Sequence, residues 1–448
     1  MTPRDTIVAT ATPQGRGGIA VLRLSGHDVP RIAQAMLGRV PEPRLATYAQ
    51  FRDATGEAID FGLALYFPAP ASFTGEPVLE LHGHGSPVLQ ALLIERAVQL
   101  GARRARPGEF SERAFLEDKL DLAQAEAVAD VIAASSRTAA QAALRSLRGE
   151  FSARVDAAEE ALIDLRVYVE ASIDFPEEEI DFLGSAEVAQ RLALVNRTLE
   201  SVTQAARQGS LLRGGLTCVI AGRPNAGKST LMNRLAGYDA AIVTDQPGTT
   251  RDVLREAVEL DGLPATLIDT AGLHAQSSDP IEREGMRRAR EEMRRADRVL
   301  FVIDAVADPL GESFEQERPD LPAGVPVTLL FNKADALGSG RRVAPSLPHL
   351  YLSAATGEGV EALRRHLMDK AGYTDAGAGA VSARARHLEA LTRAHDFTER
   401  ARAQLARRNG ELAAEELRQA QQALGEITGE FTSDDLLGEI FGSFCIGK

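Results

Sequence analysis

The pattern of hydrophobic and polar positions changes along the chain. In residues 1–118, short apolar runs end in Gly or Pro, as strands do, and one longer run after Ser86 has helical spacing. The strand-like runs are TIVATAT, GGIAVLRLSG, FGLALYFP and VLELHGHG, and the helical run is SPVLQALLIERAVQLG. This mixture predicts an N-terminal α+β domain.

A helical pattern dominates the stretch that follows. From Glu109 to Arg148 the sequence contains no Gly or Pro and is rich in Ala, Leu, Glu and Arg. The pattern continues, with interruptions near Pro176 and Gly184, until LLRGG ends it. A second helical stretch runs from about Ala380 to the end, so we predict a helical domain in two parts.

Between the two helical stretches, strand-like and helical segments alternate. The strand-like runs are LTCVIAG, ATLIDTAG, DRVLFVID, PVTLLFNK and HLYLSA. Such alternation predicts an α/β domain with a doubly wound sheet, inserted into a discontinuous helical domain whose halves pack together. The expected domains are 1–118 (α+β), 119–213 (helical, first part), 214–372 (α/β) and 373–448 (helical, second part).

Composition narrows the class of protein. The 448 residues suffice for about three domains, each with its own core. No apolar run approaches the ~18 to 20 residues needed to cross a bilayer, and the N-terminal residues lack the hydrophobic middle of a signal peptide. The two cysteines, Cys218 and Cys445, lie far apart in sequence, so no disulfide framework is expected. We therefore expect a cytoplasmic protein without a membrane partner.

The net charge of −14 argues against a protein that wraps nucleic acid over most of its surface. Two arginine-rich runs, 103–106 and 287–290, could each form a local basic patch. A solvated charged surface is the simpler interpretation of either run.

A phosphate-binding loop is predicted at 222–230. The sequence GRPNAGKST satisfies G-x-x-x-x-G-K-S/T and directly follows an apolar strand. In that context the backbone N–H groups of the loop and the following helix bind phosphates, and Lys228 neutralises the β and γ oxygens. The Ser229 hydroxyl is then a ligand for Mg²⁺.

The base specificity is predicted by NKAD at 332–335, which follows the strand VTLLF. A carboxylate accepts two hydrogen bonds from the N1–H and amino groups of guanine, and adenine has no N1–H, so Asp335 favours GTP over ATP. Lys333 would lie along the base, and the backbone of the loop at 353–355 would meet guanine O6.

Two switch regions complete the nucleotide site, but one lacks an expected side chain. Thr249 and Thr250 lie where a hydroxyl can reach Mg²⁺, and Asp269 and Gly272 of DTAG lie where the Mg²⁺ shell and the γ-phosphate are contacted. Many small GTPases have a water-orienting glutamine after this glycine, and here the residue is Leu273.

Together these residues give the chain a close resemblance to the MnmE (TrmE) family of tRNA-modification GTPases. The resemblance extends over nearly the whole sequence. It rests on DTIVATATPQGRGGIAVLRLSG, SFTGEPVLELHGHG, ARPGEFSERAFLEDKLDLAQAEA, the motifs from GRPNAGKST to GTTRD, and the terminal FCIGK.

The resemblance implies a GTP site in which a potassium ion replaces an arginine finger. The ligands of the potassium ion would be Asn225, Thr244, Gln246 and Thr249. The ligands of magnesium would be Ser229 and Thr250, and Glu282 would orient the attacking water. Alternatively, Glu282 is an ordinary residue in the first turn of a helix, where the helix dipole favours a carboxylate. The implied GTP-binding residues are Asn225, Ala226, Gly227, Lys228, Ser229, Thr230, Thr244, Asp245, Gln246, Pro247, Gly248, Thr249, Thr250, Asp269, Thr270, Ala271, Gly272, Asn332, Lys333, Asp335, Ser353, Ala354 and Ala355.

The resemblance further implies that the N-terminal domain binds a formyl- or methylene-tetrahydrofolate through Arg23, Glu80, Lys119 and Lys448. A carboxylate such as Glu80 suits the N–H edge of a pterin, and cations suit the anionic glutamate tail. The implied assembly is a homodimer built through the N-terminal domains, combined with an FAD-dependent partner of the MnmG (GidA) family in a heterotetramer or larger complex. Its implied reaction adds an aminomethyl or carboxymethylaminomethyl group to C5 of the wobble uridine of certain tRNAs.

Several alternatives stay open at this point. His82 and His84 are too few ligands for a metal site. Cys445 is either a packed structural cysteine or a functional thiol near the folate and tRNA. A GTP-dependent ribosome or RNA assembly factor without modification chemistry is the alternative function, and a nucleotide-triggered binding module is a third.

Overall fold

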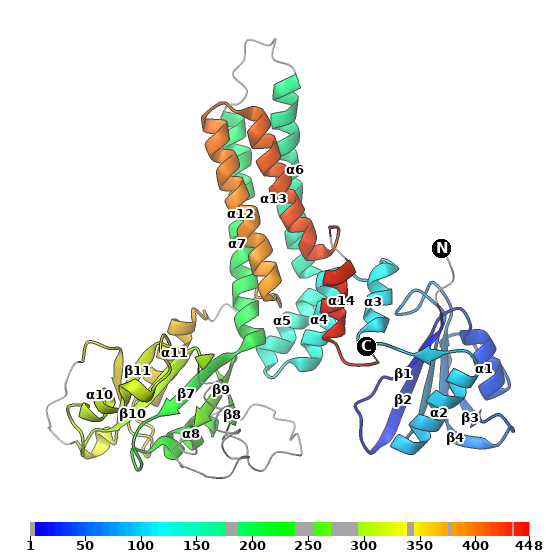
Figure 1. Ribbon diagram of the computed structural model, residues 1–448, viewed down its shortest axis with the longest axis horizontal. Helices are drawn as coiled ribbons and strands as arrows, with labels where there is room; N and C mark the ends of the chain where they lie inside the picture. The colour runs from blue at the N-terminus through cyan, green and yellow to red at the C-terminus, as the bar shows by residue number, and fades with distance from the viewer. Residues whose placement is uncertain are drawn as a thin grey trace. The chain divides into compact units, whose positions relative to one another are not determined.

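The chain folds into two compact units in a computed structural model, which describes residues 5–174, 186–237, 255–269, 294–337, 345–374, 379–431 and 434–447 (Figure 1). Unit 1 comprises Met1–Ala129, Val155–Val188 and Asp396–Lys448, and unit 2 comprises Asp130–Arg154 and Ala189–His395. No helix in the described part of the chain is long and apolar enough to cross a membrane.

Unit 1 begins with a six-stranded sheet in the order β3-β4-β5-β2-β1-β6. The pairs are antiparallel except β1 with β6. Helices α1 (Val29–Leu37) and α2 (Pro87–Gln99) cover one face, where residues such as Ile32 and Leu93 pack against the sheet. The strands are β1 (Ile7–Thr10), β2 (Gly17–Ser25), β3 (Thr47–Arg52), β4 (Ala58–Phe67), β5 (Val78–Gly85) and β6 (Arg103–Arg104).

The helical sequence from 109 to 148 forms three helices, although it contains no Gly or Pro: α3 (Glu109–Leu116), α4 (Leu122–Ala133) and α5 (Arg137–Leu147). The breaks come from capping. Asp121 accepts a hydrogen bond from the Gln124 N–H at 2.8 Å, while the Gln124 side chain accepts from the Asp121 N–H at 3.0 Å. Ser136 caps α5 by accepting from the Ala139 N–H at 3.1 Å.

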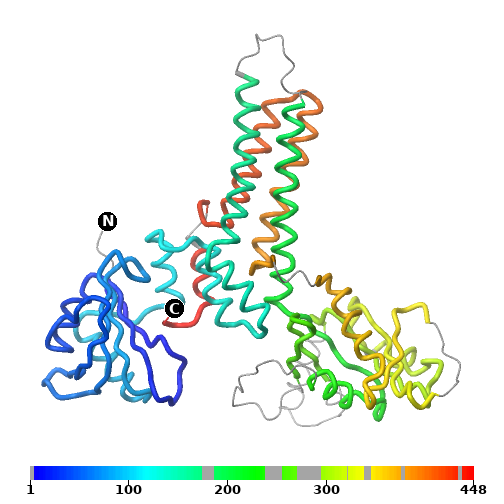
Figure 2. Tube along the Cα trace, turned by 180° about the vertical axis from the view of Figure 1, so that it is seen from behind, coloured from blue at the N-terminus to red at the C-terminus, as the bar shows by residue number. Residues whose placement is uncertain are grey.

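The remaining helices of the helical domain are α6 (Glu150–Asp174), α7 (Ala186–Gly214), α12 (Ala385–Ala406), α13 (Gly410–Thr428) and α14 (Asp434–Gly442). In unit 1, Gln421 of α13 donates to Glu159 of α6 at 3.0 Å. The C-terminal segment lies beside α3 in both views (Figures 1 and 2). There Phe441 and Phe444 pack on Leu122 and Ala125 at the start of α4.

Unit 2 contains a second six-stranded sheet, in the order β12-β11-β10-β7-β9-β8. All pairs are parallel except β8 with β9. The strands are β7 (Leu216–Ala221), β8 (Arg255–Leu260), β9 (Leu263–Asp269), β10 (Arg298–Asp304), β11 (Val327–Asn332) and β12 (His349–Tyr351). The described helices are α8 (Lys228–Ala236), α10 (Glu312–Glu317) and α11 (Val360–Ala371), with 3₁₀ turns η1 (Arg318–Asp320) and η2 (Ala334–Ala336).

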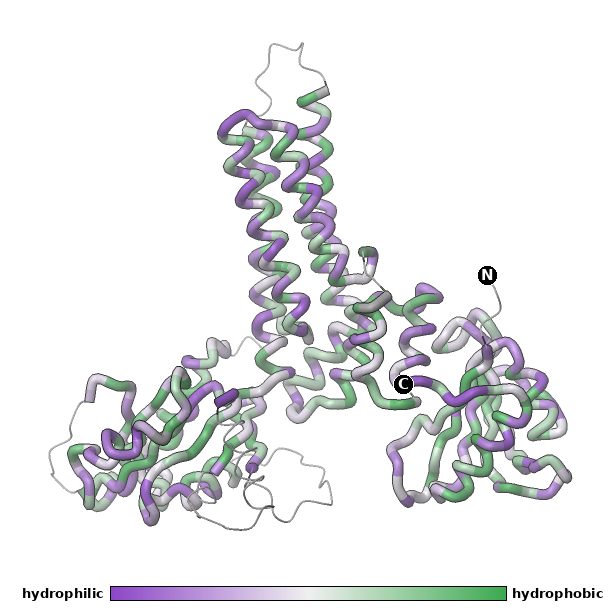
Figure 3. Tube along the Cα trace, in the orientation of Figure 1, coloured by the Kyte–Doolittle hydropathy of each residue, from purple (hydrophilic) through white to green (hydrophobic). Residues whose placement is uncertain are grey.

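Both faces of this second sheet are covered, as a parallel sheet requires. Alternate residues of β7 and β10 enter two separate hydrophobic clusters, one including Ile220 and Leu300 and the other Val219 and Phe301. Figure 3 shows hydrophobic residues gathered along these strands. The predicted fold class, with α+β, helical and doubly wound α/β parts, is confirmed.

The segment that returns from the α/β domain is fixed to the first helical part within unit 2. Asp130 of α4 accepts hydrogen bonds from Ser382 at 2.7 Å and from Arg384 and Arg213, each at 3.0 Å. The carbonyl oxygen of Gly262 in the β8–β9 turn also accepts from Ser136 at 3.1 Å. The α/β domain is therefore held to the helices at two places.

Candidate functional sites

The predicted nucleotide motifs gather at one edge of the second sheet. The register pairs Ile220 at the end of β7 with Asp269 at the end of β9, and Asp304 at the end of β10 with Asn332 at the end of β11. Because these strands are parallel, the loops after them meet at their carboxyl ends, and β7 lies where the connections change direction. Ligands of doubly wound sheets bind at such a point.

The loop after β7 has the backbone that phosphate binding requires. Gly222 has φ 129°, and a Cβ there would lie 2.2 Å from the carbonyl oxygen of Val302. Asn225 has φ 64°, and Gly227, with φ 98°, caps α8. Positive φ values turn the chain so that successive N–H groups point into the loop.

Two side chains at the start of α8 are placed differently. Lys228 is buried, and its ammonium donates to the carbonyl oxygens of Gly222 at 2.7 Å and Arg223 at 3.0 Å. Ser229, in contrast, is exposed in the first turn of the helix, where its hydroxyl is accessible to a metal ion.

Asn332 of NKAD joins two loops of the site. Its side-chain N–H donates to the carbonyl oxygen of Ala226 at 2.8 Å, and its side-chain oxygen accepts from the Ala354 N–H at 2.9 Å. A Cβ on Gly227 would lie 2.2 Å from the Asn332 amide nitrogen, so a larger residue at 227 would break this link. Asn332 therefore aligns the phosphate loop with the predicted guanine loop.

Asp335 is exposed directly after this link, and Lys333 is ion-paired to Asp304 at 2.6 Å. Burial alone would raise the pKa of Asp304, but hydrogen bonds from Lys333 and from the backbone N–H groups of Ala307 and Val306 outweigh it and lower the pKa. Asp304 thus stays ionised and fixes the direction of Lys333. Sequence reasoning did not identify Asp304.

Arg234 of α8 was also missed. Its Nε donates to the Ala354 carbonyl oxygen at 3.1 Å, and its terminal nitrogen donates to Ala355. A pocket of about 460 Å³ lies beside this contact and is lined by Thr230, Asn233, Arg234, Gly237, Ala354 and Ala355. No local motif marks Arg234, because its partners lie about 120 residues away.

Part of the predicted nucleotide site falls outside the described residues, as does the arginine-rich run 287–290. The site residues concerned are Thr244, Asp245, Gln246, Pro247, Gly248, Thr249, Thr250, Thr270, Ala271, Gly272 and Glu282, and the predicted folate residue Lys448 is a further one.

In the N-terminal domain, the structure brings Arg23 and Glu80 together on the sheet face opposite α1 and α2. They are direct neighbours on β2 and β5. Arg23 donates to one Glu80 oxygen at 2.8 Å, and His82 contacts the other at 3.2 Å. The Arg23 guanidinium also lies 5.7 Å from the centre of the Phe73 ring and 5.8 Å from that of Phe110.

Lys119 lies beside the loop that carries Phe73. It is exposed, and its ε carbon is 3.3 Å from the position that a Cβ on Gly75 would take. The C-terminal tail reaches the same domain, because Ile446 bridges to Pro107, and Gly447 packs so closely on Thr10 that no side chain would fit.

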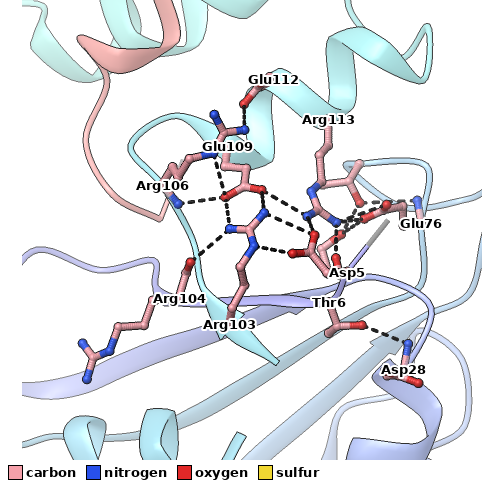
Figure 4. Close-up of polar contacts among 12 residues, drawn as sticks. Asp5, Thr6, Asp28, Glu76, Arg103, Arg104, Arg106, Glu109, Glu112 and Arg113 are labelled. Carbon is pink, nitrogen blue, oxygen red and sulfur yellow. Dashed lines mark hydrogen bonds and ion pairs between the residues drawn. The ribbon is translucent and has the colours of Figure 1, made fainter. Parts of the chain in front are cut away.

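Next to Phe110 on α3, an ion-pair network joins segments distant in sequence (Figure 4). Arg113 is 4% exposed and binds Glu76 at 2.9 Å, Asp5 at 3.2 Å and Glu109 at 3.1 Å. Arg103 pairs with Asp5 and Glu109 as well. The run 103–106 is thus not a simple solvated surface, because Arg103 takes part in this network.

The network controls two pKa values. Burial alone would raise the pKa of Glu109, but hydrogen bonds from Arg103, Arg113 and the Arg106 N–H lower it to about 2. The hydrogen bond from Arg103 is the main cause of the lowered pKa of Asp5.

The two cysteines differ in environment. Burial raises the pKa of Cys218 to about 12, so this thiol is inert. Cys445 is exposed in the tail, which excludes the packed-cysteine interpretation. Its functional role stays a prediction.

The histidines of LHGHG are bound to separate carboxylates. His84 contacts Asp60 at 2.7 Å, whereas His82 contacts Glu80. Among the residues that the structure describes, no group of three or more His, Cys, Asp or Glu side chains is arranged to hold a metal ion.

Comparison with known proteins decides the family. A family model described as "MnmE helical domain" matches residues 122–445, and one described as "GTP-binding protein TrmE N-terminus" matches residues 6–119. The tRNA modification GTPase MnmE of Pseudomonas syringae pv. tomato is 57% identical over 457 aligned residues, which cover 100% of this chain and 99% of that protein. The chain belongs to the MnmE family of tRNA modification GTPases. It is therefore a GTP hydrolase, and MnmE membership favours tRNA modification over the assembly-factor alternative.

Solved structures with lower similarity are GTP-binding proteins. A point variant of Aquifex aeolicus Era bound to GDP·AlF₄⁻ is 26% identical over 34% of this chain and 56% of its own, with a TM-score of 0.28. The G domain of Thermotoga maritima FeoB is 26% identical over 35% of this chain and 98% of its own, with a TM-score of 0.25. These scores are too low to add to what the MnmE relationship shows.

Proposed function

We propose that this MnmE-family GTPase is activated by potassium and acts with an FAD-dependent partner on C5 of the wobble uridine of certain tRNAs, using a tetrahydrofolate one-carbon unit. The arrangement that supports this most is the presence of two sites in one chain. The phosphate, NKAD and 353–355 loops form the nucleotide site, and the Arg23–Glu80 pair lies, partly exposed, on the sheet of the N-terminal domain.

In the nucleotide site, Asp335 would accept hydrogen bonds from guanine, and the hydroxyls of Ser229 and Thr250 would hold Mg²⁺. The Asn225 side chain lies in an exposed turn of the phosphate loop. Its amide oxygen, with main-chain carbonyls near Thr244, Gln246 and Thr249, offers the oxygen donors that a hard monovalent cation prefers.

A potassium ion held there would supply positive charge beside the phosphates, which removes the need for an arginine finger or a glutamine at position 273. Glu282 would orient the attacking water.

We expect GTP hydrolysis to be faster in potassium than in sodium by on the order of 10²-fold at equal ionic strength, because one preorganised charge contributes about that much to a rate. Steady-state phosphate release in the two salts measures this. The variant Asn225→Gly removes the side-chain amide proposed to bind potassium, and glycine keeps the positive φ of 64° at this position. It therefore tests the ligand without changing the backbone. Equal wild-type rates in both salts would contradict the mechanism.

In the N-terminal site, Glu80 would bind the N–H edge of the pterin, while Arg23, Lys119 and Lys448 would offset the ligand's charge. Each Glu80 oxygen already has a partner in Arg23 or His82. A carboxylate offers about four acceptor positions, so both oxygens can accept a further hydrogen bond. The Arg23 contact orients the carboxylate for that purpose.

Glu80→Ala should weaken binding of 5-formyltetrahydrofolate by at least about tenfold, because a charge-assisted hydrogen bond contributes about 1.5–3 kcal/mol. Isothermal titration calorimetry on the full chain measures the affinity. Glu95→Ala is the control, since Glu95 is an exposed carboxylate on α2, across the sheet from Glu80. Unchanged affinity in Glu80→Ala would remove Glu80 from the site.

The same proposal includes a homodimer through the N-terminal domains and a complex with the flavoprotein. The one-carbon unit would come from tetrahydrofolate, the redox step from FAD in the partner, and the cycle of assembly from GTP hydrolysis. The exposed Cys445, on the tail that reaches the N-terminal domain, would lie near the folate and the tRNA.

A further inference from the structure

The loop between β4 and β5, residues 68–77, presents an aromatic ring beside the Arg23–Glu80 pair. The Arg23 guanidinium lies near two rings, those of Phe73 and Phe110. Phe110 is 0% exposed, whereas Phe73 is 38% exposed. Of the two rings beside Arg23, Phe73 is thus the one with surface left for a ligand.

The polar side chains around Phe73 fix the loop in place. Ser25 of β2 donates to Glu76 at 2.7 Å and lies 2.7 Å from the Thr74 hydroxyl, so Thr74 donates to Ser25. The Ser72 hydroxyl donates to the Glu76 carbonyl oxygen at 2.5 Å. Thr74, next to Phe73, is fully buried. The loop is therefore held on both sides of the ring.

The buried network of Figure 4 anchors this loop to the rest of the domain. Arg113 of α3 binds both carboxylate oxygens of Glu76, at 2.9 and 3.2 Å, and also donates to the backbone carbonyl of Asp5 at 2.8 Å. Glu109 in turn binds Arg113 and is itself buried. A ring presented on such a support loses little conformational freedom when a ligand covers it.

From these contacts we propose that Phe73 is the apolar wall of the folate site, against which the pterin ring lies, and that Ser25, Glu76 and Arg113 position it. The inference rests on the proposed folate function and adds a recognition residue to it. A pterin has a polar N–H edge and two flat faces. A site that binds the edge through Glu80 also needs a surface for a face, and an aromatic contact there contributes about 0.5–1.5 kcal/mol beyond the area that it buries.

The alternative role of Phe73 is to hold Arg23 through its ring, without contact with the ligand. The two roles differ in which half of the ligand they affect. Loss of a pterin wall weakens binding of the complete folate and leaves a ligand without a pterin unaffected. Loss of support for Arg23 weakens binding of the anionic glutamate end as well.

The test measures binding of 5-formyltetrahydrofolate and of p-aminobenzoylglutamate, the same ligand without its pterin, to the full chain. We expect Phe73→Ala to weaken folate binding by about tenfold, Phe73→Tyr to retain it, and Ser25→Ala to weaken it by a few fold. Competition by p-aminobenzoylglutamate should be unchanged in Phe73→Ala. Phe61→Ala is the control, because Phe61 is an exposed aromatic residue of β4 outside this loop.

Each contrary result has a separate meaning. Folate affinity in Phe73→Ala within twofold of wild type, together with a loss in Glu80→Ala, overturns the role of Phe73 and leaves the proposed function intact. An equal loss for both ligands in Phe73→Ala overturns the wall and assigns the ring to Arg23. Absence of folate binding by the wild-type chain overturns the proposed folate function and this inference together.

Discussion

Asp335→Asn is expected to weaken GTP binding by about 100-fold and to raise the affinity for xanthosine triphosphate. On the proposed function, the Asp335 carboxylate would face two donors on guanine, whereas an asparagine would present one oxygen and one N–H group, which opposes a guanine donor. Xanthine carries a carbonyl in place of the guanine amino group, so the asparagine amide matches it. Titration of full-length wild type and variant with both nucleotides measures the change in specificity.

Glu361→Gln is the control for Asp335→Asn. Glu361 is an exposed carboxylate on α11, ion-paired to Arg365, and its replacement should leave the ratio of the two affinities unchanged. Asp335→Asn should leave the loop at 353–355 in place. That loop is held by hydrogen bonds to the side chains of Asn332 and Ser353, not to that of Asp335. An unchanged preference for GTP in the variant would show that Asp335 does not select the base.

The nucleotide loops could be predicted from sequence because each is a short motif beside a regular strand. GRPNAGKST and NKAD follow β7 and β11, and a parallel sheet brings the ends of its strands to one edge whatever lies between them. In the N-terminal domain, α1 and the edge strand β3 were not predicted. In the TYAQFR sequence of β3 the aromatic Tyr48 is exposed and the polar Gln50 is half-buried, so apolar and polar residues do not mark the buried and exposed faces by alternation.

The contacts that hold the sites together could not be predicted in this way. Asn332 was expected only as part of the GTP-binding motif, yet it joins two protein loops separated from it by 106 and 22 residues. Arg113 lies in a quoted family block, but its partner Asp5 is 108 residues away. Such pairings depend on how the strands are ordered, and no local periodicity encodes that order.

Because this network joins distant segments, we expect the largest loss of stability in the variant Glu109→Gln. The pKa of Glu109 is lowered from 4.5 to about 2, and a difference of about 2.5 pH units corresponds to about 3 kcal/mol of stability near neutral pH. Glu109→Gln keeps the shape of the side chain but removes this contribution. Hydrogen exchange of β1 and α3 amides in the full chain should then be about 100-fold faster wherever exchange requires opening of the domain.

Glu112→Gln is the control, because it removes the same charge one turn later on α3 from a carboxylate that is less buried than Glu109. It therefore shows whether the effect depends on burial or on charge alone. In the Glu112–Arg106 pair the two side chains are 21% and 64% exposed, so the pair is partly open to solvent, and surface pairs contribute about 0–1 kcal/mol. The pH dependence supplies a second check. Because the folded-state pKa of Glu109 lies below 4.5, its contribution is fully present above pH 4.5 and is lost as the pH falls toward 2. The difference between wild type and Glu109→Gln should therefore shrink over that interval, and a difference that is constant with pH would mean that packing, not the charge of Glu109, stabilises α3.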